Sequence, residues 1–198
     1  SEEDARAADS GTLLEHTETE EKPVMRETIK EEEKSEEKER AEAEIRPEQI
    51  GKVRLNFDCY SGEDLYSDGD IEDEILSIVK SCRRGEYPAV VESRRSWPIL
   101  YHLSPLRGNI VDWLPIGPED KVLEIGSGCG AITEKLAEKA GSVTCVDLSL
   151  RRSQINAYRN QDRDNIEIYL GNFGDIEPAL PTDYDFVCMI GVFEYGRS

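Results

Sequence analysis

Hydrophobic and polar positions divide this chain into a first part without regular apolar spacing and a second part in which such spacing recurs. Residues 27–46 are mostly Glu, Lys and Arg, and no apolar stripe runs through them. A helix that lacks an apolar stripe cannot dock stably on a core. We therefore interpret residues 1–50 as a disordered acidic tail or linker, and we keep a partner-binding helix within it as the alternative.

After the tail, the pattern predicts one strand and two helices. Residues 52–60 alternate between apolar and polar, which is typical of a strand. Residues 71–79 show the apolar spacing of an amphipathic helix, for which Asp70 is the expected N-cap. A Ser-Pro pair predicts the start of a second helix over residues 104–113. We assign residues 51–116 to a lead-in or cap region.

From residue 117 onward, short apolar runs alternate with helical spacing. The predicted strands are 121–125, 142–146, 166–170 and 186–190, and the predicted helices are 131–140 and 149–160. Nearly continuous apolar strands separated by helices are typical of a parallel sheet covered on both faces. For residues 117–198 we therefore predict an α/β fold with a Rossmann-like doubly wound parallel sheet. The expected spatial order is third, second, first and fourth predicted strand.

Composition and charge exclude several classes of function. The chain has 43 acidic and 24 basic side chains, giving a net charge of −19, and this excess disfavours binding to nucleic acid. The longest apolar stretch, residues 186–193, is too short to span a bilayer, and no signal-peptide pattern is present. The five cysteines form no CxxC pair, and no histidine has metal-ligand spacing. This predicts no metal site and a reducing, cytoplasmic location.

The first candidate for chemistry is a glycine turn between a predicted strand and a predicted helix. Gly126, Ser127, Gly128 and Gly130 occupy this turn, and Glu124 stands two residues before the first glycine. Glycines permit a tight turn and let a ligand approach the backbone at a helix N-terminus. The turn also satisfies G-x-G-x-x-A, so the pattern alone does not separate a dinucleotide site from other nucleoside sites.

Further polar residues follow the later strands at the same edge of the predicted sheet. Asp147 ends the second strand, 21 residues after Gly126, where a carboxylate can accept hydrogen bonds from ribose hydroxyls. A polar turn with Asn172 and Phe173 follows the third strand and can face an adenine. The fourth strand opens into Gly191 beside the glycine turn.

Residues 109–195 together resemble the class I S-adenosylmethionine-dependent methyltransferases. Residues 124–130 look like the first motif of this family, Asp147 like its ribose-binding acid, and Leu148 like the apolar residue that packs on the adenine. The resemblance implies S-adenosyl-L-methionine as the cofactor. It implies as cofactor-binding residues Glu124, Gly126, Ser127, Gly128, Gly130, Asp147, Leu148, Asn172, Phe173, Gly191 and Arg107.

The implied activity is methyl transfer to an unidentified acceptor, either a small molecule or a macromolecule, with catalytic residues unknown. In this family Glu124 would lie near the methionine ammonium, whereas its structural alternative is to cap the amides of the glycine turn. For Asp147 the alternative is an N-cap of the helix that begins near Ser149. Arg107 would border the carboxylate of the cofactor, and its alternative is an ordinary surface arginine.

Two other functions compete with this one. A nicotinamide- or flavin-dependent oxidoreductase fits the glycine turn, but Glu124 stands where dinucleotide folds carry an apolar residue. A non-catalytic module that binds the cofactor, with the acidic tail recruiting a basic partner, is the second alternative. Calcium binding at the acidic loop of residues 64–75 is disfavoured, because EF-hand positions three and twelve would be Tyr66 and Ile75.

The family's sheet has seven strands, of which four are predicted here, and the chain begins with Ser1. We therefore expect a fragment of a longer protein, to which further domains can be fused. For residues 1–198 alone we expect weak cofactor binding and no methyl transfer, because a closed site is needed to orient an acceptor. We also expect association through the bare edge of the fourth strand.

Overall fold

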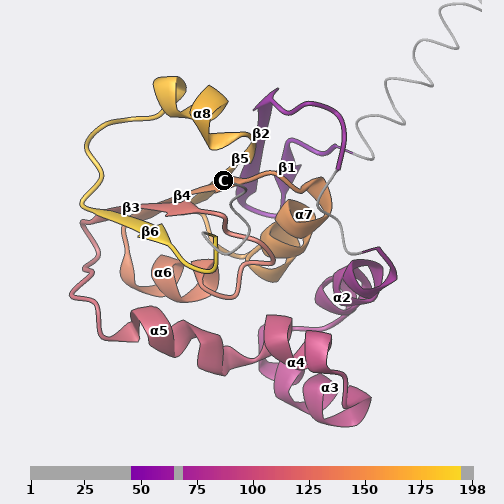
Figure 1. Cartoon of the computed structure of the whole chain (residues 1–198). Helices are drawn as coiled ribbons and strands as arrows, with labels where there is room; N and C mark the ends of the chain where they lie inside the picture. The colour runs from indigo at the N-terminus through magenta and orange to yellow at the C-terminus, as the bar shows by residue number, and fades with distance from the viewer. Residues whose placement is uncertain (1–45, 65–68, 193–198) are drawn as a thin grey trace, which may run out of the picture. The chain divides into compact units, whose positions relative to one another are not determined.

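A six-stranded sheet forms the centre of the computed structural model, which describes residues 46–64 and 69–192 (Figure 1). The strands are β1 (Gln49–Ile50), β2 (Val53–Cys59), β3 (Lys121–Ile125), β4 (Ser142–Asp147), β5 (Ile166–Gly171) and β6 (Phe186–Met189). Their spatial order is β1-β2-β5-β4-β3-β6. Only β1 and β2 pair antiparallel, and all other neighbours are parallel. The predicted α/β fold is confirmed.

The four strands predicted after residue 117 have the expected order. In the sheet they stand as β5-β4-β3-β6, with Val122 of β3 opposite Val143 of β4 and Phe186 of β6. The chain leaves β3 first toward β4 and later returns to its other side as β6. In open parallel sheets such a reversal leaves a crevice at the carboxyl ends of the two strands, and ligands bind there.

The strand predicted at residues 52–60 extends this same sheet. β2 runs parallel to β5, and Leu55 stands opposite Ile168. The lead-in region therefore contributes a sheet strand as well as helices. The proposed boundaries at residues 50 and 116 stay predictions.

Helices cover both faces of the sheet. They are α2 (Asp70–Ser81), α3 (Tyr87–Arg94), α4 (Trp97–Leu103), α5 (Asn109–Asp112), α6 (Thr133–Lys139), α7 (Leu150–Arg159) and α8 (Phe173–Ile176), with 3₁₀ turns η1 (Arg84–Glu86), η2 (Pro105–Gly108) and η3 (Glu177–Ala179). Successive residues of a strand point to opposite faces. Val122 accordingly packs in the cluster that contains Leu136 of α6, whereas Leu123 packs in the cluster that contains Ile176 of α8. Figure 1 shows α6 and α8 on opposite sides of the sheet.

Helices α2, α3 and α4 share a second core that lies on α7. Ile75 and Val79 of α2, Ile99 and Leu103 of α4 and Ile155 of α7 belong to one buried cluster. The apolar stripe predicted for residues 71–79 is the face that α2 buries in this cluster. The cap is thereby attached to the helix that follows β4, next to the carboxyl ends of the strands.

Several predicted helix ends are corrected by the structure. Asp70 is the first residue of α2, and the N-cap is Gly69, whose φ of 68° is unfavourable for other residues. The helix predicted at 104–113 is split into η2 and α5 at Gly108, in line with the low helix propensity of glycine. Ser104 does cap η2, since its hydroxyl accepts a hydrogen bond from the Leu106 amide.

One strand, β1, and three α-helices, α3, α4 and α8, were not predicted, and neither were the 3₁₀ turns η1 and η3. Both α3 and α4 carry a proline in their first turn, which is a usual start signal. The predicted acidic tail lies outside the described residues, except for its last five positions. Within the described ranges, no helix has the length and apolarity to cross a bilayer.

Candidate functional site

The carboxyl ends of β3 and β6 open into a cavity of about 600 Å³. Its walls come from the glycine turn after β3, from the cap and from the end of β6. The predicted cofactor-binding residues that line this cavity are Arg107, Glu124, Gly126, Ser127, Gly128 and Gly191. The structure therefore brings together six residues from three separate parts of the sequence at the crevice between β3 and β6.

The glycine turn is closed on one side and open on another. Gly126 has a φ of 74°, and a Cβ atom there would lie 2.4 Å from Cγ2 of Val192. Gly128 has a φ of 52°, but a Cβ atom there would meet nothing within 4 Å. Gly126 is thus needed for close approach of the segment after β6, whereas Gly128 leaves open space where a ligand can approach the backbone.

Gly130 has a different role from the other two glycines. A Cβ atom at this position would lie 2.3 Å from the side-chain oxygen of Asn156 on α7. Gly130 therefore faces the interior and is not part of the cavity lining. Its glycine is required by the close packing between the turn and α7.

Glu124 places a buried carboxyl group at the cavity. Its Oε2 accepts a hydrogen bond of 2.6 Å from the Thr133 hydroxyl and one of 3.6 Å from the Cys145 thiol. Burial raises the pKa of this carboxyl from 4.5 to about 7, and the two hydrogen bonds oppose the rise. In the described part of the chain, neither a cation nor a glycine-turn amide is bound to this carboxylate.

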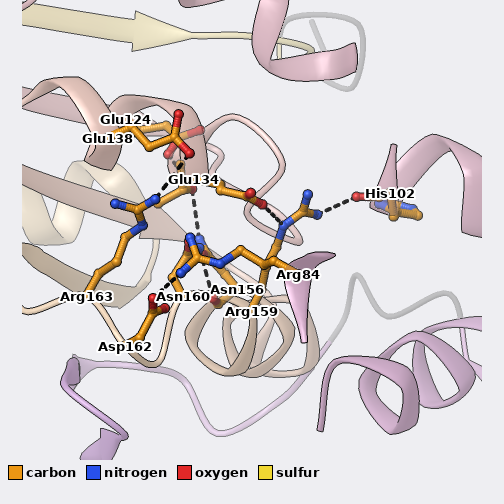
Figure 2. A network of polar contacts seen from close by, with 11 residues as sticks. Arg84, His102, Glu124, Glu134, Glu138, Asn156, Arg159, Asn160, Asp162 and Arg163 are labelled. Atoms are coloured by element: carbon orange, nitrogen blue, oxygen red, sulfur yellow. Dashed lines mark hydrogen bonds and ion pairs between the residues drawn. The ribbon is translucent and has the colours of Figure 1, made fainter. Parts of the chain in front are cut away.

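A chain of polar side chains extends from Glu124 into α7. Asn156 donates a hydrogen bond of 3.0 Å to the Thr133 hydroxyl, and Asn160 donates one of 2.9 Å to the Asn156 side-chain oxygen. Figure 2 shows Glu124, Asn156 and Asn160 in this network. Since Thr133, Asn156 and Asn160 are fully buried, the network fixes the orientation of Glu124.

Asp147 joins the end of β4 to the glycine turn. Its Oδ2 accepts a hydrogen bond of 2.7 Å from the Gly128 amide, and its Oδ1 accepts one of 2.9 Å from the Ser149 amide. Burial raises the pKa of the Asp147 carboxyl, although these two amides favour its charged form. The N-cap of α7 is Ser149, whose hydroxyl accepts from the Arg152 amide. Each Asp147 oxygen retains a lone pair that can accept from a hydroxyl.

Leu148, Asn172 and Phe173 follow strands at the same sheet edge but do not line the cavity, whereas Arg107 reaches the cavity from the cap. Leu148 is 39% exposed, directly after Asp147. Asn172 is the N-cap of α8 and accepts from the Gly174 amide, and Phe173 packs on the core beneath α8. Arg107 lies 3.9 Å from the centre of the Tyr101 ring and has no ion-pair partner among the described residues.

Sequence reasoning missed most of the cap side of the cavity. The additional lining residues include Ile71, Trp97, Tyr101, His102, Arg152 and Ile190. Arg152 is held by the buried carboxylate of Glu72 at 2.6 Å, which joins α7 to α2. These two residues are 80 positions apart, and no local pattern connects them. The i,i+4 spacing of Trp97 and Tyr101 after a serine was the only local signal.

The residues at the cavity fit S-adenosylmethionine, the cofactor that the resemblance implies. Glu124 is a buried carboxylate that has no cation beside it among the described residues, and such a group suits an ammonium ligand. Asp147 stands beside the open space at Gly128, where it can accept from ribose hydroxyls. Within the described ranges, no cluster of three or more His, Cys, Asp or Glu side chains could hold a metal ion.

Comparisons with known proteins agree with this fit. Residues 123–197 match the family model described as "Methyltransferase domain". A probable ribosomal RNA small subunit methyltransferase A from Methanococcoides burtonii is 39% identical over 64 residues, which is 32% of this chain and 24% of that protein. The corresponding protein of Methanosarcina mazei is 40% identical over 75 residues, covering 38% of this chain and 26% of that protein.

Among solved structures, a putative S-adenosyl-L-methionine-dependent methyltransferase from Methanococcus maripaludis is similar with a TM-score of 0.41 and 21% identity. That alignment covers 59% of this chain and 53% of the other. The chain spans about a quarter of the length of the curated relatives that it matches. The matched segment contains the glycine turn and the strands that border the cavity. Residues 123–197, which hold the glycine turn and most of the strands at the cavity, are thus similar to methyltransferase domains that use S-adenosylmethionine.

Proposed function

We propose that this chain binds S-adenosylmethionine in the cavity at the carboxyl ends of β3 and β6. We propose further that it is part of an enzyme that transfers the methyl group to an acceptor. The observation that carries this proposal is the pair of carboxylates at the glycine turn, of which Glu124 is buried and Asp147 is partly buried. Glu124 lines the cavity and meets no cationic partner in the part of the chain that the structure describes, and Asp147 accepts from the amide of Gly128. An ammonium group and a pair of ribose hydroxyls are ligands that match these two carboxylates in charge and in hydrogen bonding.

The bound cofactor supplies an activated methyl group on a sulfonium, and the protein contributes binding and orientation. In this proposal Glu124 holds the ammonium group, oriented by Thr133 and Cys145. Asp147 holds the ribose while its own position is fixed by the Gly128 and Ser149 amides. Residues of α2, α4 and η2 form the cap wall of the cavity.

The other predicted residues would bind the adenine end and the carboxylate end of the cofactor. Leu148, Asn172 and Phe173 border the adenine, because they follow β4 and β5 at the same edge of the sheet. Arg107 faces the carboxylate of the cofactor from the cap, and its lack of an ion-pair partner in the described chain supports that role. Gly130 supports the turn from behind through its contact with Asn156.

The identity of the methyl acceptor is a separate question, for which there are two kinds of candidate. The curated relatives are named as ribosomal RNA methyltransferases, which makes RNA a candidate acceptor. The net charge of −19 opposes this candidate and favours a small-molecule or protein acceptor. Next to the cavity, the side chains of Trp97 and Tyr101 are 72% and 41% exposed, so a ring-bearing acceptor could stack there.

Two measurements test this function. Thermal shift and titration calorimetry on the 198-residue chain should show binding of S-adenosylhomocysteine and none of NADH or FAD. Binding of NADH instead would favour the oxidoreductase alternative. A transfer assay with radiolabelled methyl groups then distinguishes the candidate acceptors. It uses the chain joined to its natural flanking sequence and offers total RNA and small-molecule extracts as separate acceptors. Cofactor binding without transfer to any fraction would favour the non-catalytic module.

A further inference from the structure

Helix α4 forms one wall of the cavity, so its position decides the shape of the cavity. Trp97 and Tyr101 line the cavity, whereas Ile99 and Leu103 are buried in the cluster that contains Ile155 of α7. Apolar packing of this kind holds the helix against α7, but it is non-directional. A directional contact is needed to set how α4 lies along α7.

Arg159 supplies a contact of this kind. It is the last residue of α7 and is only 3% exposed. Its Nε donates a hydrogen bond of 2.6 Å to Glu134 of α6, and its Nη1 donates one of 2.5 Å to the backbone carbonyl of His102 in α4. Its guanidinium also lies 5.6 Å from the centre of the Tyr87 ring of α3. Figure 2 shows the guanidinium between Glu134 and His102.

The position of the His102 carbonyl makes this contact specific. His102 is in the last turn of α4, where backbone carbonyls lack an amide partner inside the helix. A cation at the C-terminal end of a helix is also favoured by the helix dipole. The planar guanidinium has donors in fixed directions, so its bond to Glu134 determines where the second bond can point. Arg159 therefore sets the C-terminal turn of α4 relative to α6.

We propose that Arg159 is a positioning residue for the cofactor cavity, acting through the His102 carbonyl on the placement of Trp97 and Tyr101. This inference rests on the proposed function, because it concerns the same cavity. Arg159 does not line the cavity itself, and it acts on the cavity only through α4.

The chain offers two matched controls. Arg163 is another partly buried arginine that contacts α6, through Glu138 and the carbonyl of Ala137, and none of its contacts reaches α4. Glu134→Gln removes the ion pair with Arg159 but keeps an oxygen that accepts its hydrogen bond. Both controls disturb the same region without removing the bond to His102.

The test is titration of the 198-residue chain with S-adenosylhomocysteine by calorimetry. Arg159→Met should raise the Kd about tenfold or more, because a charge-assisted hydrogen bond that orients the wall is lost. Arg163→Met and Glu134→Gln should each change the Kd by no more than about twofold. Arg159→Lys should restore part of the affinity, since a lysine keeps the cation but lacks the fork of donors.

A spectroscopic readout separates positioning from general loss of stability. In a Trp113→Phe background, Trp97 is the single tryptophan, and its fluorescence should change when S-adenosylhomocysteine enters the cavity. Arg159→Met should lose most of this change at saturating ligand, whereas Arg163→Met should keep it. A lower melting temperature with an intact Trp97 response would show a structural role only and would overturn the proposal.

The outcomes also separate this inference from the proposed function. If the unmodified chain binds no S-adenosylhomocysteine, the proposed function fails and this inference fails with it. If the unmodified chain binds and Arg159→Met binds equally well, only this inference fails. Should Arg159→Met not fold, the Glu134→Gln/Arg159→Met double variant leaves no unpaired carboxylate. The losses expected of Arg159→Met are then expected of this double variant, and a smaller loss is expected of Arg159→Lys.

Discussion

Thr133 of α6 donates a hydrogen bond of 2.6 Å to the carboxylate of Glu124 at the end of β3. Both side chains are buried, and Glu124 has no cationic partner in the described chain. The site thus holds an acid whose charged form is disfavoured until a cation arrives. Its titration should therefore report both on folding and on binding of the cofactor.

The first prediction concerns stability and pH. The pKa of Glu124 is about 7 in the folded chain, above the ordinary 4.5 that it has when unfolded, so the unfolded chain loses this proton first as the pH rises. Between these two values the folded state binds more protons, and the free energy of unfolding should fall by about 3 kcal/mol on account of this group. Glu124→Gln should remove that part of the pH dependence.

Urea denaturation at pH 4.5, 6 and 7.5 would measure the free energy of unfolding of both proteins. The quantity to compare is the difference between the unmodified chain and Glu124→Gln, because other acids are common to both. This difference should grow from pH 4.5 to about pH 7 in favour of the variant and then stay level. A constant difference over the whole range would mean that Glu124 is not held as described.

The second prediction concerns cofactor binding and pH. An ammonium group next to Glu124 favours the ionised carboxylate, so the affinity for S-adenosylhomocysteine should rise from pH 5.5 to about pH 7.5. At pH 6 binding should release a proton, which calorimetry in two buffers of different ionisation enthalpy can measure. Glu124→Gln should bind more weakly and show neither effect. If proton release persists in this variant, another group binds the ammonium.

The strand order and the candidate turn followed from local patterns. Apolar runs identify β3, β4 and β5 because most of their side chains are covered on both faces. The apolar run of β6 identifies that strand as well, although Val187 and Met189 are exposed on one of its faces. Glu124 and Asp147 stand at fixed places next to such runs, and parallel strands bring their carboxyl ends to one edge. The predicted strand order was therefore enough to place both carboxylates near the glycine turn.

The cap wall of the cavity did not follow from local patterns. Trp97 and Tyr101 reach the cavity because Ile99 and Leu103 pack on α7 and because Arg159 binds the last turn of α4. These contacts join segments more than fifty positions apart. The sequence shows each residue but not which distant residue it meets. Gly130 is a similar case, since only the structure shows that it faces Asn156.

The third prediction concerns Asp147. Asp147→Ala removes the acceptor for the ribose hydroxyls and the bond to the Gly128 amide, so cofactor binding should weaken by about 2–4 kcal/mol. Asp162→Ala is a suitable control, because Asp162 is exposed and pairs with Arg84 away from the cavity. Calorimetry with S-adenosylhomocysteine gives both affinities. Equal affinities for the two variants would show that the ribose is bound elsewhere.

The last prediction compares two glycines of the same turn. Gly128 and Gly130 both have a positive φ, so alanine at either position adds about 1–2 kcal/mol of backbone strain. At Gly130 the added methyl group would also collide with Asn156 in the buried polar network, whereas at Gly128 it would enter open space. Gly130→Ala should therefore lower the melting temperature clearly more than Gly128→Ala does. Conversely, Gly128→Ala should weaken binding of S-adenosylhomocysteine in a protein that remains folded, because its methyl group occupies the space where the ligand approaches the backbone. Thermal melts with and without ligand measure both effects, and a Gly128→Ala protein with unchanged affinity would place the cofactor away from this turn.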